Sequence, residues 1–331
     1  LALKSRILLY RASPQNNPSG DTERWKEAAQ AAHDLIELSK YTLEGNYGNL
    51  FSDTTSHQSK EVILAYMTGA NNTPETDNYP ISTNGGKTGT CPSANLVDAY
   101  ENADGTPFDW NSLTPGDDPY AGRDPRLQYS IVVNDSQWNG RTMQCYDGGA
   151  DGSGVTQATT TGYYLKKFLT DGLDLEKNQT SVHSWILFRY AEILLNYAEA
   201  MNEAYGPDTD PFGDGKTARW AVNEVRGRVG MPPVTASDET EMRNRIKHER
   251  RIELAFEDHR FWDVRRWGKA DAESALGVPV KGVSITKTET GFTYATKIVG
   301  TRTFQEKMML YPIPQSEILR SAGKIEQNPG W

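Results

Sequence analysis

The chain has 331 residues, of which 37% are hydrophobic and 24% are charged, and its formal net charge is −9. A chain of this length and composition can bury one large core or two modest ones, and it has no bias toward disorder. The acidic balance argues against a nucleic-acid or anionic-membrane surface, because phosphate binding depends on clustered Lys and Arg. Neutral or cationic ligands fit this charge better.

Residues 1–50 predict a helical hairpin. The first helix ends near Ser13, and Asp21 is placed to cap a second helix over residues 25–39. Small residues such as Ala28 and Ala32 line one stripe of that helix and allow the close packing typical of tetratricopeptide-like repeats. Residue 1 already reads as helix, without an initiator Met or signal-peptide pattern. We therefore expect an upstream segment, with any export signal or lipid attachment site, to be missing from this chain.

Residues 51–184 are rich in Gly, Asn, Thr, Asp and Pro, with apolar runs at 61–66 and 127–133 that predict isolated strands. Loops of this length in a compact domain are usually functional or disordered, so we expect a loop-rich ligand-binding region here. Cys91 and Cys145 both fall within it. The sequence leaves a disulfide and two separate thiols equally open.

Residues 185–331 predict a helical region. A helix over 185–205 carries polar residues at steps of three and four, which indicates a solvated helix face and not a membrane span. These residues are Arg189, Glu192, Asn196, Glu199 and Glu203. A helix over 217–229 completes a second hairpin. A charged helical region over 239–267, a hairpin or lid up to residue 303 and a short helix from residue 315 follow.

Five different sequence motifs follow one another along this half of the chain. They occupy residues 189–200, 222–228, 249–267, 311–314 and 327–330. Together they resemble the C-terminal signature of the SusD/RagB family, and residues 95–101 and 123–127 upstream are similar to that family too. The resemblance covers nearly the whole chain.

The resemblance implies a single SusD-like domain over residues 1–331 that lacks its N-terminal part. Its fold class would be mainly α, a tetratricopeptide-like helical hairpin scaffold with a loop-rich middle region and a few short strands. The implied function is cell-surface binding of an oligosaccharide or polysaccharide and its delivery to a SusC-like TonB-dependent channel. The implied location is the outer membrane of a Bacteroidetes-type bacterium, with a lipid anchor upstream of this chain. The RagB branch binds peptides, which is the alternative ligand class, and the family catalyses nothing.

A glycoside hydrolase is the rival function. Glu249, Glu253 and Glu257 lie on one predicted helix face at i, i+4 steps, with β-carbons about 5–6 Å apart, near the separation that a retaining glycosidase uses. Arginines crowd the same segment, for example Arg250 and Arg251, and paired Glu–Arg networks suit a structural role better than acid–base chemistry. Catalysis by the Glu249/Glu253 pair is therefore the disfavoured alternative.

Metal motifs are incomplete. His248 and Glu249 begin like a zincin helix, but Ile252 stands where the second His is required. Asp208, Asp210 and Asp214 resemble the start of a calcium loop, although no Glu closes it. We favour an Asp-rich turn, with calcium as the alternative, and expect no other cofactor.

Aromatic and amide residues in the middle loops predict sugar contacts, because sugars stack their C–H faces on aromatic rings and pair their hydroxyls with polar side chains. The predicted ligand-binding residues are Tyr66, Asn71, Asn72, Tyr79, Trp110, Tyr120 and Trp138. For Trp110 and Trp138, packing onto the scaffold is an equal alternative. The aromatic residues of the helical motifs are instead predicted as core: Trp185, Tyr190, Trp220, Phe256, Phe261, Trp262, Trp267 and Trp331.

Overall fold

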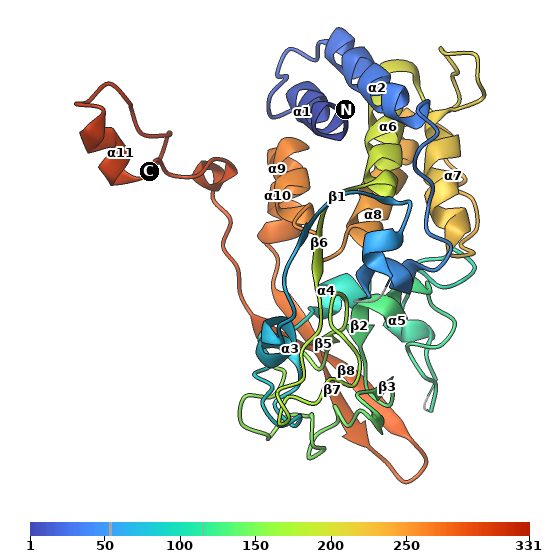
Figure 1. Ribbon diagram of the computed structural model, residues 1–331, viewed down its shortest axis with the longest axis vertical. Coiled ribbons are helices and arrows are strands. Elements are labelled where there is room, and N and C mark those ends of the chain that lie inside the picture. Colours follow the sequence, from blue (N-terminus) through green and yellow to red (C-terminus); the bar gives the residue numbers. More distant parts are fainter. Residues whose placement is uncertain (53–54, 115) are drawn as a thin grey trace.

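The computed structural model describes residues 1–52, 55–114 and 116–331. Helices α1 (Ala2–Ala12) and α2 (Thr22–Ile36) form the expected first hairpin, at the top of Figure 1. The Asp21 carboxylate accepts the Glu23 N–H at 3.0 Å and caps α2, as predicted. Alanines at positions 28, 29 and 32 are buried, and their small size lets the neighbouring helices approach closely.

Helix α6 (Tyr190–Tyr205) is the centre of the helical half. It packs against α1, α2, α7 (Ala218–Arg228) and α8 (Glu239–Glu253), and α6 with α7 makes the second hairpin. The scaffold is mainly α and tetratricopeptide-like, as predicted, and this half has its own apolar core. Helices α9 (Arg260–Arg266) and α10 (Lys269–Leu276) lie beside it (Figure 1).

The prediction of a solvated face on α6 was wrong. Glu192, Asn196 and Glu199 are all buried, because other helices surround α6. Each polar group has a partner instead. Glu192 binds Arg6 at 2.6 and 2.7 Å, Asn196 accepts from Arg250 at 2.8 Å, and Glu199 binds Arg266 at 2.7 Å. Glutamates at helical spacing therefore mark buried ion pairs here.

The first residues of the predicted helix over 185–205 form a strand. Strand β6 (Ser184–Arg189) pairs antiparallel with β1 (Val62–Met67), with Tyr66 opposite Trp185. The apolar run alternates with a period of two, so Ile186 points inward and Trp185 outward. Leu187 is 40% exposed for the same reason.

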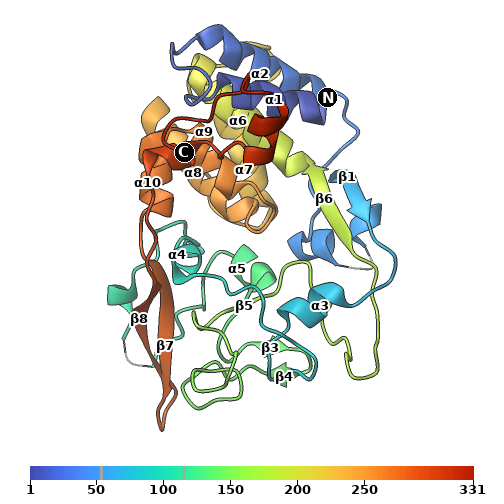
Figure 2. The ribbon, with the colours of Figure 1, turned by 90° about the vertical axis from the view of Figure 1, so that its left-hand side faces the viewer.

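The lower half of the molecule consists of loops with short elements between them (Figure 2). It contains α3 (Thr73–Asn78), α4 (Ala94–Val97), α5 (Arg126–Ser130) and the strand pairs β2 (Ile131–Val132) with β5 (Tyr164–Leu165) and β3 (Gln137–Trp138) with β4 (Arg141–Thr142). Single 3₁₀ turns are η1 (Tyr47–Phe51), η2 (Ser56–Gln58) and η3 (Trp110–Ser112). The strand predicted over 127–133 is helical up to Ser130, and only its end is extended. A second apolar core, rich in Tyr, fills this half.

A long hairpin of β7 (Val280–Lys287) and β8 (Phe292–Gly300) crosses the lower half, which confirms the hairpin expected before residue 303. Its position is fixed by backbone hydrogen bonds: the Val283 N–H donates to the Thr161 carbonyl at 2.8 Å, and the Asp147 N–H donates to the Ile285 carbonyl at 2.7 Å. Gly162 has φ +87°, and a β-carbon there would lie 2.7 Å from Val283 Cγ1. The loops and the hairpin are thus one packed unit.

The chain ends in an arm with η4 (Glu306–Met309) and the predicted short helix α11 (Gln315–Arg320), which extends away from the body in Figure 1. Three of the aromatic residues predicted as core are exposed, so that prediction was wrong for them: Trp185 by 38%, Trp262 by 45% and Trp331 by 43%. Trp331 lies on the arm and Trp262 faces Tyr311 of the arm. Trp267 is buried as expected.

Cys91 and Cys145 are separate thiols, which decides between the two states that the sequence left open. Among the helices of the described residues, none combines the length and the apolar content needed to cross a bilayer. The division into residues 1–50, 51–184 and 185–331 stays a prediction.

Candidate functional site

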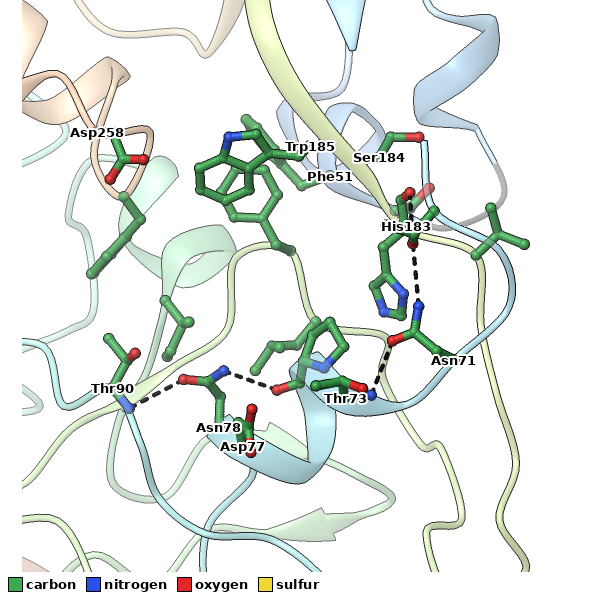
Figure 3. A pocket seen from close by; sticks show the side chains of 18 residues that line it. Phe51, Asn71, Thr73, Asp77, Asn78, Thr90, His183, Ser184, Trp185 and Asp258 are labelled. Carbon is green, nitrogen blue, oxygen red and sulfur yellow. Dashed lines mark hydrogen bonds between the residues drawn. The ribbon is translucent and has the colours of Figure 1, made fainter. Parts of the chain in front are cut away.

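A cavity of about 630 Å³ opens between the β1–β6 ribbon, α3 and the loop that follows β5 (Figure 3). Aromatic rings form its upper wall. The Phe51 and Phe168 rings meet edge to face with centroids 4.9 Å apart, and the Phe168 and Trp185 rings are tilted by 33° at the same separation. Phe51 is buried, whereas Trp185 is 38% exposed. Trp185 therefore presents an indole surface to the cavity, and its contact with Phe168 fixes the orientation of the ring.

The strand register explains why this indole faces outward. Ile186 and Phe188 anchor β6 to the core, so Trp185 between Ser184 and Ile186 must lie on the opposite face. Its cross-strand partner Tyr66 is 65% exposed. Two aromatic side chains thus stand side by side on the outer face of the ribbon.

Amide side chains held by backbone groups form the floor of the cavity. Asn71 Oδ1 accepts the Thr73 N–H at 3.1 Å, and its Nδ2 donates to Thr68 Oγ1 at 3.2 Å. Asn78 Nδ2 donates to the Pro74 carbonyl at 2.9 Å, and its Oδ1 accepts the Thr90 N–H at 3.1 Å (Figure 3). These hydrogen bonds fix the orientation of both side-chain amides, so the floor of the cavity is preorganised for hydrogen bonding.

His183 forms the side wall next to Asn71 (Figure 3). Its Nε2 lies 2.9 Å from Oε1 of Glu75, and the same oxygen accepts the Thr170 N–H at 2.9 Å. Glu75 is fully buried, whereas Nδ1 of His183 has no hydrogen-bond partner among the described residues. The imidazole is therefore held in place by a buried carboxylate and has one nitrogen that the protein leaves unsatisfied.

The charges around the cavity are negative or neutral. The described lining includes the carboxylates Asp77 and Asp258 and contains neither Lys nor Arg. Asp77 pairs with Lys87 at 3.0 Å, and both side chains are exposed. A surface ion pair of this kind is weak. Because the lining has carboxylates and no Lys or Arg among the described residues, the cavity suits an uncharged or cationic ligand.

Only part of the predicted ligand set meets at this cavity. Asn71 lines it and Tyr66 stands beside Trp185. Asn72 turns away, because its Nδ2 donates to Asn178 Oδ1 at 3.1 Å and to the Gln179 carbonyl at 3.0 Å.

The remaining predicted residues lie in or against the lower core. Tyr79 and Trp138 are buried, with exposed fractions of 0% and 2% and ring centroids 6.1 Å apart, so this geometry gives them a packing role. Trp110 and Tyr120 both contact Tyr294 of the hairpin. Trp185 lines the cavity although it was predicted as core. The two-residue alternation of residues 184–189 was the signal that could have placed it on the surface.

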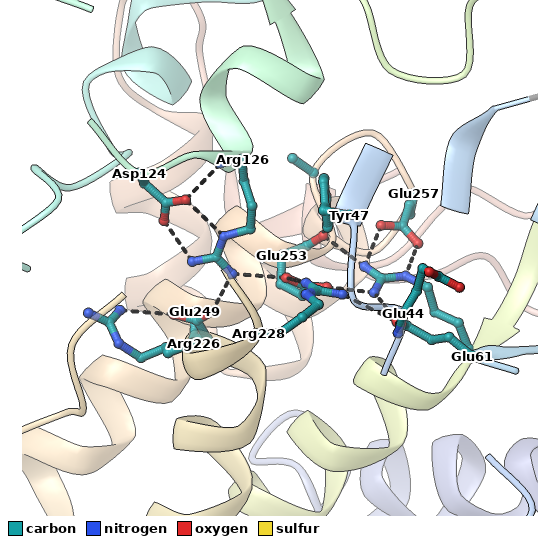
Figure 4. Close-up of polar contacts among 12 residues, drawn as sticks. Glu44, Tyr47, Glu61, Asp124, Arg126, Arg226, Arg228, Glu249, Glu253 and Glu257 are labelled. Atoms are coloured by element: carbon teal, nitrogen blue, oxygen red, sulfur yellow. Dashed lines mark hydrogen bonds and ion pairs between the residues drawn. The ribbon is translucent and has the colours of Figure 1, made fainter. Parts of the chain in front are cut away.

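The glutamates of the hydrolase hypothesis are buried among arginines (Figure 4). Glu253 contacts Arg189 at 2.6 Å, Arg228 at 2.5 Å and Arg126 at 2.9 Å. Burial opposes ionisation of Glu253, but these three guanidinium groups together hold its pKa well below the usual range.

The other two glutamates are paired as well. Glu249 binds Arg126 and lies 3.1 Å from Arg226. Burial alone would raise the pKa of Glu257, yet Arg189 and Lys167 lower it to about 2. A general acid needs a raised pKa, so neither Glu253 nor Glu257 is suited to proton donation.

Each carboxylate of the calcium hypothesis has its own protein partner. Asp208 binds Arg219 at 2.6 and 2.8 Å, and Asp210 accepts the N–H groups of Gly213 and Gly215 at 2.8 Å. Asp214 binds Lys216 at 2.6 Å and approaches His33 at 2.9 Å. The geometry is that of an Asp-rich turn between α6 and α7, and does not support calcium.

The chain is similar to known proteins over almost its whole length. A family model described as the SusD family matches residues 49–331. A solved SusD-like protein from Bacteroides fragilis is 30% identical, with a TM-score of 0.80, and the match covers 100% of this chain and 64% of that one. A SusD-like carbohydrate-binding protein from the same species is 29% identical, with a TM-score of 0.77 and coverage of 96% and 62%.

A curated relative, a SusD-like protein from Formosa agariphila, is 29% identical over an aligned length of 182 residues, and the match covers 53% of this chain and 31% of that protein. The chain spans less than two thirds of the length of each of these three relatives.

Proposed function

This chain belongs to the SusD family, and on that premise we propose that it binds an oligosaccharide or polysaccharide at the cell surface and delivers it to a SusC-like TonB-dependent channel. The outer-membrane location and the lipid anchor belong to the same proposal. One observation carries the glycan-binding part: the exposed indole of Trp185 stands over a floor of fixed amides in the cavity beneath the β1–β6 ribbon.

The chemistry of this cavity matches that of a sugar. Pyranose rings offer C–H faces that pack on the negative face of an indole, while their hydroxyls need donors and acceptors around the edge. Asn71, Asn78 and His183 supply both kinds of group. A volume of about 630 Å³ lies within the range of roughly 300–1,000 Å³ usual for ligand sites, enough for a short stretch of a glycan.

The proposed role is binding without catalysis. The carboxylates at helical spacing on α8 and beyond are neutralised by arginines, and a hydrolase needs two carboxyl groups with different pKa values. A peptide ligand is the competing class. A pull-down with a peptide library, run beside the glycan panel, separates the two classes.

Trp185→Ala is expected to weaken glycan binding at least about tenfold, because truncating a central Trp typically costs ~2 kcal/mol or more and each 1.4 kcal/mol is tenfold in Kd. Affinity gel electrophoresis against soluble polysaccharides, followed by calorimetry with oligosaccharides of the retained polymer, measures the change. Trp262→Ala is the matched control, since Trp262 is 45% exposed but does not line the cavity. Equal affinities of the two variants would contradict the assignment of this cavity.

A further inference from the structure

A second hollow lies between β8, residues 110–114 and 116–118, and the turn after β2. Two adjoining depressions of about 280 and 250 Å³ share Gly116, Asp117, Phe292 and Tyr294. We name them together the hairpin groove, defined by Trp110, Asp117, Asn134, Asp135, Phe292 and Tyr294. Figure 2 shows β8 and α3 on opposite sides of the lower half. The groove is therefore separate from the cavity beside α3.

Aromatic rings line the groove in a row. The Trp110 and Tyr294 centroids are 6.3 Å apart, and those of Tyr294 and Phe292 are 6.5 Å apart. Trp110 is held from behind, because its Nε1 donates to Asp98 Oδ1 at 3.0 Å and Phe108 packs against it edge to face at 5.1 Å. All three groove rings are half-buried, so each has a packed side and an open side.

One polar side chain of the groove lining, that of Asn134, has a donor without a partner among the described residues. Asn134 is 3% exposed, and its Oδ1 accepts the Cys145 N–H at 3.0 Å. Its Nδ2 is buried and has no hydrogen-bond partner among the described residues. A buried donor without a partner costs about 1–3 kcal/mol. A ligand oxygen that reached this donor would remove that cost.

The charge of the groove selects among ligand classes. Its described lining holds the carboxylates Asp117, Asp118 and Asp135 and contains neither Lys nor Arg. Polyanions such as nucleic acids, uronates and sulfated glycans are repelled. An apolar peptide segment would bury these carboxylates without a counter-ion, which is costly. Hydroxyl groups of an uncharged sugar donate to carboxylates and stack their C–H faces on the rings.

From this combination we propose that the hairpin groove is a second binding site for an uncharged glycan chain. The inference rests on the proposed glycan-binding function and adds a site to it. A polysaccharide long enough to reach both sites gains affinity through effective concentration, without any new contact. Short oligosaccharides occupy either site singly.

The test compares two arginine substitutions on β8. Thr296 and Ala295 are both exposed, but only Thr296 lines the groove. The probes are galactomannan, xylan, laminarin, starch and the anionic polygalacturonate in affinity gels, with melting temperatures recorded for every variant. Thr296→Arg is expected to weaken binding of the retained neutral polysaccharide about tenfold, whereas Ala295→Arg binds like the parent. In a Trp185→Ala background, Thr296→Arg removes the remaining retention.

The outcomes separate the two proposals. Equal retention of Thr296→Arg and Ala295→Arg overturns the groove site and leaves the cavity beneath the ribbon intact. Preferential binding of polygalacturonate overturns the assigned charge class. A parent that binds none of the polymers overturns both proposals. Tyr294→Phe, which removes only a hydroxyl, is the milder variant and is expected to lower neutral polysaccharide binding severalfold.

Discussion

Glu253→Ala is expected to lower the free energy of unfolding by about 3–5 kcal/mol, because removing one member of a buried ion pair leaves its partner uncompensated. Here one carboxylate serves three guanidinium groups, those of Arg126, Arg189 and Arg228. The side chains of these arginines are at most 3% exposed and have little access to water. The loss is therefore expected at the upper end of that range.

The position of Glu253 in the chain explains why this effect is global. Arg126 belongs to the lower half, Arg189 ends the β1–β6 ribbon, and Arg228 ends α7. The Glu253 carbonyl also accepts from the Tyr47 hydroxyl at 2.9 Å and from Arg189 at 2.8 Å. Removing the carboxylate loosens the junction between the helices and the loops.

Chemical denaturation with guanidinium chloride measures the change. Glu239→Gln is the matched control, because Glu239 lies on the same helix but pairs with Arg243 at the surface, where an ion pair contributes about 1 kcal/mol or less. Unfolding midpoints that are the same for both variants would show that the buried network does not stabilise the fold. Glu253→Gln keeps the size of the side chain and separates loss of charge from loss of packing.

The same network shows what the family motifs do in this chain. Arg189, Glu249, Glu253 and Glu257 come from motif segments, and the structure assigns them to ion pairs that join the two halves. The motifs therefore predicted the scaffold well, since they record its interior. The cavity beneath the β1–β6 ribbon is built mostly from residues outside them, such as Asn71, so motif matching alone could not locate it.

Helix starts were predicted correctly where they depend only on neighbouring residues. The cap at Asp21 and the start of α7 after Thr217 follow from side chains that bond their own helix. The burial of Glu192 and Glu199 could not be predicted in this way. Their spacing on α6 is the same for a solvated face and a buried one, and their partners Arg6 and Arg266 lie far away in the sequence.

The helix prediction was wrong at residues 185–189 for a related reason. A short apolar run can satisfy both the helical period and the strand period. The alternation at residues 184–189 favours the strand, and pairing with β1, more than a hundred residues earlier, stabilises it. That choice also decides the site, since a helix would have buried Trp185. The exposed indole follows from the register of Tyr66 and Trp185.

Acid is expected to unfold the protein in a steep transition that begins below pH 4.5. Glu257 has its pKa lowered from 4.5 to about 2: burial opposes ionisation, but Arg189 and Lys167 more than offset it. Arginines similarly lower the pKa values of the buried Glu253 and Asp263. In this window the unfolded chain binds more protons than the folded one, so stability is fully present above pH 4.5 and is lost as pH falls toward 2.

Glu257 alone accounts for about 3 kcal/mol of this loss, at about 1.4 kcal/mol for each pKa unit. Lys167 acts at the other end of the scale. Burial lowers the pKa of Lys167 to about 8 despite Glu257. The charged lysine therefore destabilises the folded state below pH 8, and this destabilisation disappears as pH rises from 8 toward 10.5. Denaturation midpoints measured from pH 7 down to pH 3 show the loss of stability in acid. Glu257→Gln should be less stable at pH 7 and show a shallower dependence below pH 4.5, because it removes one titrating group; parallel pH profiles of parent and variant would place the lost stability in other carboxylates.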